Sequence, residues 1–250
     1  MDEKLFNNKK VILIAGPKGG VGKTTIALNI SIALAHLNKR TLLVDADFSI
    51  PSFSLLYGQE YHLRYESIYN VEELLKNITL KGPNGVDIIP SPYFDFMKKD
   101  LEKEYTQKLL EGIKNTNSYD VVIIDLSPGF NDSHLSYIEM SDLMIIVTTP
   151  EPSSISASYS LMKIITSEIP DTKVGILINQ ADSIEEGAEV FTKFSAAVSF
   201  FLEKSISHMG DIPEDENVVR SSKEEIPVIL RFPDTIASMA INKLACKLVG

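Results

Sequence analysis

The sequence is poor in cysteine and has no long apolar run. Its single cysteine, Cys246, excludes a disulfide within the chain and a metal site built from a cysteine pair. No apolar stretch approaches the roughly 20 residues that a membrane-spanning helix needs, and the start, MDEKLFNNKK, lacks the apolar segment of a signal peptide. We therefore expect a cytoplasmic protein, with peripheral attachment to the inner face of the membrane through a partner as the alternative.

The chain also has fewer basic than acidic residues. The 24 lysines and arginines are outnumbered by 34 aspartates and glutamates, which gives a net charge of −10. Affinity for DNA comes largely from lysine and arginine contacts to phosphates. The lysines around residues 98–108 are interleaved with acids, which is typical of a solvated helix of mixed charge. We do not expect DNA to be the partner.

What the sequence does contain is a regular alternation of apolar strands and helical patterns. Strands are predicted at 10–15, 41–45, 86–89, 120–125, 143–148, 173–179 and 209–212, and helices most clearly at 23–37, 153–167, 184–207 and 234–248. Strands that are apolar throughout indicate a parallel sheet covered on both faces. We expect an α/β fold, a doubly wound and mostly parallel sheet of about seven or eight strands with helices on both faces, in one domain over residues 1–250.

Polar residues stand where four of these strands end. A glycine-rich loop follows the first strand, Asp45 and Asp47 close the second, Asp125 ends DVVIID, and Asn179 ends KVGILIN. In open α/β sheets, ligands bind beyond the carboxyl ends of the strands. The sequence therefore predicts that these groups converge on one binding site.

The loop GPKGGVGKTT, residues 16–25, has the composition of a phosphate-binding loop. Its glycines let successive backbone N–H groups point at phosphate oxygens, and the helix that follows adds its positive end. Lys23 should reach the β- and γ-phosphates, and Thr24 should ligate Mg²⁺. Binding of one nucleotide does not explain why the loop carries a second lysine, Lys18.

Residues 18–25, KGGVGKTT, resemble the deviant phosphate loop of the MinD/ParA class of ATPases. VDADFSIPSFSLLYG (44–58) and IIDLSPG (123–129) resemble the two switch regions of that class. VTTPEPSSISASYSLMK (147–163) is similar to the flagellar-number regulator FlhG, and GDIPEDENVVRSS (210–222) is similar to both FlhG and MinD. The resemblance covers nearly the whole chain and implies a P-loop ATPase that uses ATP and Mg²⁺.

The resemblance also implies a role for individual residues. The catalytic residues would be Lys18, Lys23 and Asp47. Lys18 would reach across the interface of an ATP-bound homodimer to the partner's phosphates, much as an arginine finger does, and Asp47 would orient the attacking water. The metal residues would be Thr24, Asp45 and Asp125, with the two acids acting through the waters that Mg²⁺ usually keeps.

The nucleotide itself would be held by a wider set of residues. These are Gly19, Gly20, Val21, Gly22, Lys23, Thr24, Thr25, Asn179, Pro213 and Asp215. Asn179 matches the residue that contacts adenine in this class. Asn179 and Asp182 also have the N-x-x-D spacing of GTPases, but the lysine of that pattern is missing, so we favour ATP and keep GTP as the alternative.

Several positions depart from the class pattern. Ser127 stands where the second switch usually has proline, Ala157 stands where a helix usually has aspartate, and Ser52 and Ser54 replace asparagine and aspartate of the first switch. These changes leave the rate of hydrolysis and the coupling to a partner open. A nucleotide-binding scaffold with little hydrolysis is therefore one alternative.

Two further segments carry expectations of their own. IASMAINKLACKL, near the end of the sequence, has two lysines and no aromatic anchor, so we expect it to pack on the domain and membrane binding to be weak or absent. Tyr57, Tyr61, Tyr65 and Tyr69 are spaced four apart, which indicates either a packing stripe or a surface for a partner.

The histidines show no metal spacing and no serine has the context of a covalent nucleophile. We expect a slow, partner-stimulated ATPase switch of the MinD/FlhG type that controls the position or number of a cellular structure through an unidentified protein partner. A metal or iron–sulfur delivery ATPase on the same scaffold is a further alternative, which the single cysteine disfavours.

Overall fold

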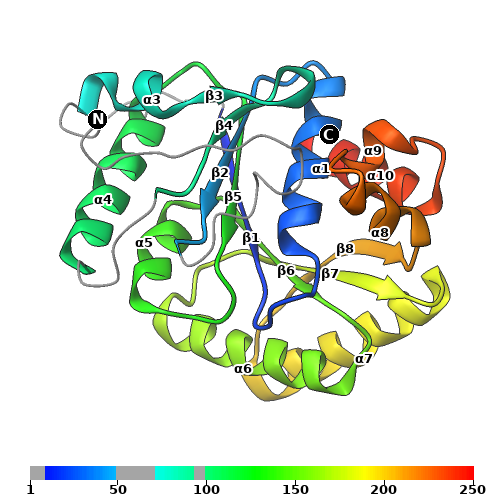
Figure 1. The fold of residues 1–250 in the computed structure, drawn as a ribbon. Helices are drawn as coiled ribbons and strands as arrows, with labels where there is room; N and C mark the ends of the chain where they lie inside the picture. The colour runs from blue at the N-terminus through cyan, green and yellow to red at the C-terminus, as the bar shows by residue number, and fades with distance from the viewer. Residues whose placement is uncertain (1–8, 49–70, 93–98) are drawn as a thin grey trace.

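A computed structural model of the chain describes residues 9–48, 71–92 and 99–250. Eight strands form one sheet: β1 (Lys10–Ala15), β2 (Thr41–Ala46), β3 (Leu80–Lys81), β4 (Asp87–Ile89), β5 (Val121–Leu126), β6 (Leu143–Thr148), β7 (Val174–Ala181) and β8 (Ser207–Pro213). Their order is β3-β4-β2-β5-β1-β6-β7-β8, and every pairing is parallel except that of β3 with β4. The predicted α/β sheet is confirmed (Figure 1).

Helices cover both faces of this sheet. They are α1 (Lys23–His36), α3 (Val71–Ile78), α4 (Lys99–Asn115), α5 (Asp132–Met140), α6 (Pro152–Glu168), α7 (Ile184–Leu202), α8 (Glu216–Lys223), α9 (Val228–Arg231) and α10 (Ile236–Val249). One face is packed by α4, α5, α6 and α7, and the other by α1, α9 and α10. In Figure 1, α1 lies beside α8, α9 and α10, while α4 and α5 lie across the sheet from them.

The central strands are apolar because both of their faces are buried. In β1, Val11 and Leu13 belong to the core on the α4–α7 side, whereas Ile12 and Ile14 belong to the core on the α1 side. Successive side chains of a strand point to opposite faces, so a strand between two helical layers needs apolar residues at every position. This packing fixes the register of the strands and therefore places their carboxyl ends side by side.

The structure corrects some predicted boundaries. The helix expected over 184–207 ends at Leu202, because Glu203 has a left-handed backbone conformation with φ of 51° that turns the chain toward β8. β8 therefore starts at Ser207 and is longer than the predicted strand at 209–212. The short antiparallel edge strand β3 was not predicted, since two residues are too few for a periodic pattern.

The segment near the end of the sequence behaves as expected. Ile241, Leu244 and Leu248 of α10 are buried in the core with α1. No helix in the described parts of the chain has the combination of length and apolar character that crossing a bilayer requires. Ser52, Ser54 and the four tyrosines from Tyr57 to Tyr69 lie outside the described residues.

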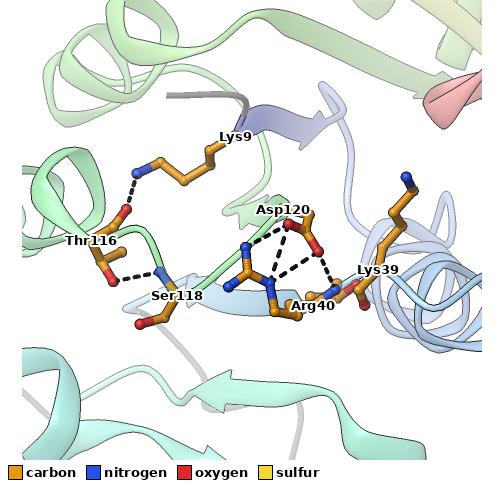
Figure 2. Close-up of polar contacts among 7 residues, drawn as sticks. Lys9, Lys39, Arg40, Thr116, Ser118 and Asp120 are labelled. Atoms are coloured by element: carbon orange, nitrogen blue, oxygen red, sulfur yellow. Dashed lines mark hydrogen bonds and ion pairs between the residues drawn. The ribbon is translucent and has the colours of Figure 1, made fainter. Parts of the chain in front are cut away.

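At the amino ends of the strands, polar contacts join segments that are distant in sequence (Figure 2). The Asp120 carboxylate accepts hydrogen bonds from the Arg40 backbone N–H at 2.8 Å and from Arg40 Nη2 at 2.7 Å, so the residue before β5 is tied to the residue before β2. Lys9 Nζ donates to the carbonyl of Thr116 at 2.6 Å, just after α4. These contacts fix the edge of the sheet that lies opposite the predicted site.

We expect Asp120→Asn to lower the free energy of unfolding slightly, and only above acidic pH. The Arg40 guanidinium and backbone N–H lower the pKa of Asp120 to about 2. A depressed pKa stabilises the fold above the unfolded value, near 3.8, and that stabilisation is lost as the pH falls toward 2. Because both side chains are more than one-third exposed, the effect should stay below about 1 kcal/mol.

Urea unfolding of the wild type and of Asp120→Asn between pH 7 and pH 3 checks this expectation. The difference between the two proteins should shrink as the solution becomes more acidic. Glu189→Gln, which removes an exposed ion pair to Lys193 within α7, is the matched control and should have no measurable effect. A difference that grows on acidification would contradict the assignment.

Candidate functional site

The glycine-rich loop connects β1 to α1 at the carboxyl edge of the sheet. Gly20 and Gly22 have φ of 82° and 92°, a region that L side chains rarely adopt, and Gly22 is the N-cap of α1. A Cβ at Gly22 would also come within 2.4 Å of Asn179 Nδ2, which donates a hydrogen bond to the Val21 carbonyl at 2.9 Å. The end of β7 is therefore packed directly against the loop.

Lys23 is a buried lysine in the first turn of α1. Its side chain is folded back over the loop, with Nζ 3.1 Å from the Lys18 carbonyl oxygen, and the residue is 6% exposed. Burial lowers the pKa of Lys23, while the charges of Asp125 and Asp47 act in the opposite direction. A buried ammonium beside a glycine-rich loop and the N-terminus of a helix favours a polyanionic ligand.

Asp45 and Asp125 end the neighbouring strands β2 and β5, where they are paired in register. Both residues are 1% exposed. The Asp47 backbone N–H donates to Asp45 Oδ1 at 3.0 Å. Neither oxygen of Asp125 accepts a hydrogen bond within the described parts of the chain.

The electrostatics of Asp125 fit a bound cation. Burial raises its pKa to about 7, although the Thr24 hydroxyl and the Lys23 charge act to lower it. A buried carboxylate whose charge is not fully compensated is costly, and a divalent cation beside it would remove that cost. The donor set, two carboxylates and the Thr24 hydroxyl, consists of the hard oxygen ligands that Mg²⁺ prefers.

A pocket of about 450 Å³ opens beside the loop. Ten of the predicted site residues line it: Gly19, Gly20, Gly22, Lys23, Thr24, Thr25, Asp47, Asn179, Pro213 and Asp215. Lys18, Val21, Asp45 and Asp125 are not among its lining residues. Asp45 and Asp125 are buried behind the loop, and Val21 contributes its side chain to the core.

One wall of the pocket is apolar and is formed by residues of α8, α9 and α10. Val218, Val228 and Ile241 line it, and sequence reasoning did not identify them. Asn29, buried in α1, accepts a hydrogen bond from the Ile229 backbone N–H at 3.0 Å and so holds α9 against α1. Such residues carry no motif, because ordinary apolar side chains become a pocket wall only through the folding of distant segments.

The Asp215 carboxylate has a structural task beside this wall. It caps α8 by accepting from the Asn217 backbone N–H at 2.9 Å, and it also accepts from the Ala237 backbone N–H at 3.3 Å. Asp215 thus anchors the turn that carries Pro213 past the pocket. Its direct contact to a nucleotide stays a prediction.

Lys18 lies on the surface of the loop and contacts the start of α6. Its Nζ donates to Ser153 Oγ at 2.9 Å and lies 3.6 Å from Glu151 Oε2. The side chain is 40% exposed. Within one chain, Lys18 is therefore directed to α6 and not into the pocket of its own loop.

A contact close to the site was also missed by sequence reasoning. Ser127, in the loop after β5, is hydrogen-bonded through Oγ to Nε2 of His134 at 2.8 Å. The spacing of seven residues belongs to no motif, and it brings the two side chains together only because α5 folds back onto the loop. The nearest signal in the sequence was that Ser127 departs from the class pattern.

Comparisons with known proteins agree with this geometry. The model of the ParA family, described as NUBPL iron-transfer P-loop NTPase, matches residues 7–249. The antiactivator FleN of Pseudomonas aeruginosa is 30% identical, over 95% of this chain and 85% of FleN.

Two solved structures share the fold. The septum site-determining protein MinD of Pyrococcus horikoshii, complexed with Mg-ADP, superposes with a TM-score of 0.76 at 23% identity, covering 96% of each chain. The MinC:MinD cell division protein complex of Aquifex aeolicus includes a chain with a TM-score of 0.71 at 26% identity, again covering 96% of each. Since the family model spans nearly the whole sequence, the chain belongs to the ParA family of P-loop NTPases.

Proposed function

We propose that this protein is an ATPase switch, acting as a single domain over residues 1–250. It binds Mg·ATP, forms a homodimer in that state, engages a partner protein, and separates after hydrolysis. The observation that carries the proposal is the meeting of a buried ammonium, Lys23, and a buried carboxyl group, Asp125, beside the glycine loop. Together they complement a triphosphate and its cation.

The loop and its flanking residues divide the work of binding. Backbone N–H groups from Gly19 to Thr25 and the Lys23 ammonium hold the phosphates, while Thr24, Asp45 and Asp125 hold Mg²⁺. Bound Mg²⁺ would neutralise the charge that develops on the phosphates during transfer. Asp47 lies on the pocket wall and would orient the water that attacks the γ-phosphate.

Lys18 supplies a reason for dimerisation. Two chains facing each other across their nucleotides would each bury a strong negative charge, and a lysine from the opposite chain would offset it. In the single chain, Lys18 is held by contacts to Ser153 and Glu151 at an exposed site, so it is accessible to a second copy. A reciprocal contact of this kind suits a twofold symmetric dimer.

The base is proposed to be adenine. Asn179 and Pro213 line the pocket, whereas Asp182, which would read guanine in a GTPase, is exposed and is not among the lining residues. Competition of unlabelled ATP and GTP for a fluorescent nucleotide distinguishes a preference for adenine from a preference for guanine. A clear preference for GTP would contradict this assignment.

The relatives suggest what the switch controls. FleN is named an antiactivator, the Pyrococcus protein is named for the septum site, and the Aquifex MinD is seen in complex with MinC. We propose that this chain likewise controls the position or number of a cellular structure through a protein partner, from the cytoplasm or from the membrane surface to which that partner recruits it.

Substitution of Lys18 tests the switch directly. With Mg·ATP, the molecular mass of the wild type in solution should double, and with Mg·ADP or after chelation of Mg²⁺ it should not. Lys18→Ala should bind ATP but remain single, and its turnover should fall about ten-fold or more, because it lacks the charge supplied by the second chain. Light scattering on a sizing column and a phosphate-release assay measure the two effects.

Lys163→Ala is the matched control for this experiment. Lys163 is an exposed lysine on α6, the helix that Lys18 contacts, and its removal should change neither mass nor turnover. If Lys18→Ala dimerised and hydrolysed ATP as the wild type does, the proposed role of Lys18 would be wrong. A wild type that never doubles in mass would contradict the switch itself.

Iron transfer is the second candidate, because the matching family model carries that description. Cys246 is exposed on α10, and no group of three or more potential metal-binding side chains occurs among the residues that the structure describes. Anaerobic incubation with iron and sulfide should therefore leave no chromophore on the protein. A cluster retained by wild type and lost in Cys246→Ser would favour iron transfer instead.

A further inference from the structure

A histidine and a serine join the two ends of the loop that follows Asp125. Ser127 Oγ and His134 Nε2 are 2.8 Å apart. Ser127 directly follows the end of β5, two residues after Asp125, and His134 lies in the first turn of α5. The bond therefore ties a loop residue beside the pocket to a helix of the α4–α7 layer.

His134 is held in place from several sides. The residue is 3% exposed, its backbone N–H donates to Asn131 Oδ1 at 3.2 Å, and its ring meets Phe130 edge-on with centroids 6.2 Å apart. Burial lowers the pKa of His134 to about 4, with a smaller opposing effect from Asp47 and a contribution from Lys23, so the imidazole is neutral at pH 7. A neutral ring that is fixed in place can keep the hydrogen bond to Ser127 in one geometry without adding a charge beside the pocket.

The loop that His134 holds is itself part of the pocket. The Gly129 backbone N–H donates to the Gly16 carbonyl at 3.1 Å, which joins this loop to the start of the phosphate loop. Pro128, between Ser127 and Gly129, lines the pocket. Serine at 127 has no ring to restrict its own φ, so the side-chain bond to His134 adds a constraint on the loop there.

We propose that His134 is a positioning residue for ATP hydrolysis, which it supports by holding Ser127 and thereby the loop 127–130 in place against the phosphate loop. The proposal rests on the ATPase function proposed above. His134 is not among the residues that line the pocket. It acts through Ser127, so its loss should affect the turnover number while nucleotide binding remains.

Four variants test this role by steady-state hydrolysis of Mg·ATP. His134→Leu and Ser127→Ala should each lower kcat about ten-fold, because small displacements of groups around the reacting atoms are costly, with KM within about two-fold of wild type. The double variant should be no slower than either single one, since both remove the same bond. His134→Gln, whose amide nitrogen can replace Nε2, should restore kcat to within about three-fold of wild type.

A direct view of the bond gives a readout that does not depend on turnover. In protein labelled with ¹⁵N at histidine, Ser127→Ala should move the Nε2 resonance of His134. It should leave His208, which is bonded through Nε2 to Asp211 at 2.8 Å, unchanged. His208→Gln is the matched control for kinetics, because it removes a similar bond outside the pocket and should leave kcat at the wild-type value.

The outcomes separate failure of this inference from failure of the proposed function. A wild type without turnover, alone and with partner, would overturn the proposed function and this role with it. Equal kcat in wild type and His134→Leu, or an unmoved His134 resonance in Ser127→Ala, would overturn the positioning role alone. If the role of His134 were purely structural, His134→Gln would lose thermal stability and kcat together with His134→Leu. That outcome would also overturn the positioning role.

Discussion

Asp47→Ala should abolish most turnover while the protein still holds Mg·ATP. We expect kcat to fall about 100-fold or more, because an oriented acid that positions or activates water contributes about that much. Asp47 lies on the pocket wall, directly after the end of β2, and its charge opposes the lowering of the Lys23 pKa that burial causes. Loss of the carboxylate should leave phosphate binding by the loop intact.

The variant should therefore accumulate as an ATP-bound dimer. Phosphate release and light scattering in the presence of Mg·ATP measure both properties on one sample, and the trapped protein serves to capture the partner. Asp182→Ala is the control, since Asp182 is an exposed aspartate directly after β7 and does not line the pocket. Normal turnover in Asp47→Ala would show that another group orients the water.

Lys23→Ala should weaken ATP binding about 100-fold, because removal of a buried charge that is paired with a ligand costs 2 kcal/mol or more. The affinity for Mg·ADP should fall as well, since the lysine is expected to contact both terminal phosphates. Calorimetric titration measures both constants, with the melting temperature as a check on folding.

Lys193→Ala is the matched control, because this exposed lysine lies on α7 and does not line the pocket. It should bind ATP as the wild type does. If Lys23→Ala changed the affinity for ATP by less than about three-fold, the assignment of the loop as a phosphate site would be contradicted. The charged hydrogen bond from Lys23 to the phosphates would then be absent.

The sequence was sufficient to predict the sheet and the loop, for a physical reason. Buried parallel strands such as β1 and β5 must be apolar at every position, and the loop must contain glycines where φ is positive, as at Gly20 and Gly22. Constraints of this kind leave local patterns. The predicted site residues at the ends of β2, β5 and β7 are consequently brought to one edge, although their roles stay predictions.

Other features could not be predicted because they depend on contacts between distant segments. The end of α7 is set by the backbone conformation of Glu203, a residue type with no strong preference for it. The contact of Lys18 with α6 and the bond between Ser127 and His134 likewise follow from the tertiary fold. The spacing of these residues along the sequence does not predict these contacts.

The hydrogen bond between Asn29 and the backbone of Ile229 has a consequence for biosynthesis. The phosphate loop leaves the ribosome before the apolar wall formed by Val228 and Ile241, because it precedes that wall in the sequence. A nascent chain that has emerged only as far as β7 can offer a loop for phosphates but no shelter for the base. We therefore expect the nucleotide to be held fully only after synthesis has passed α10.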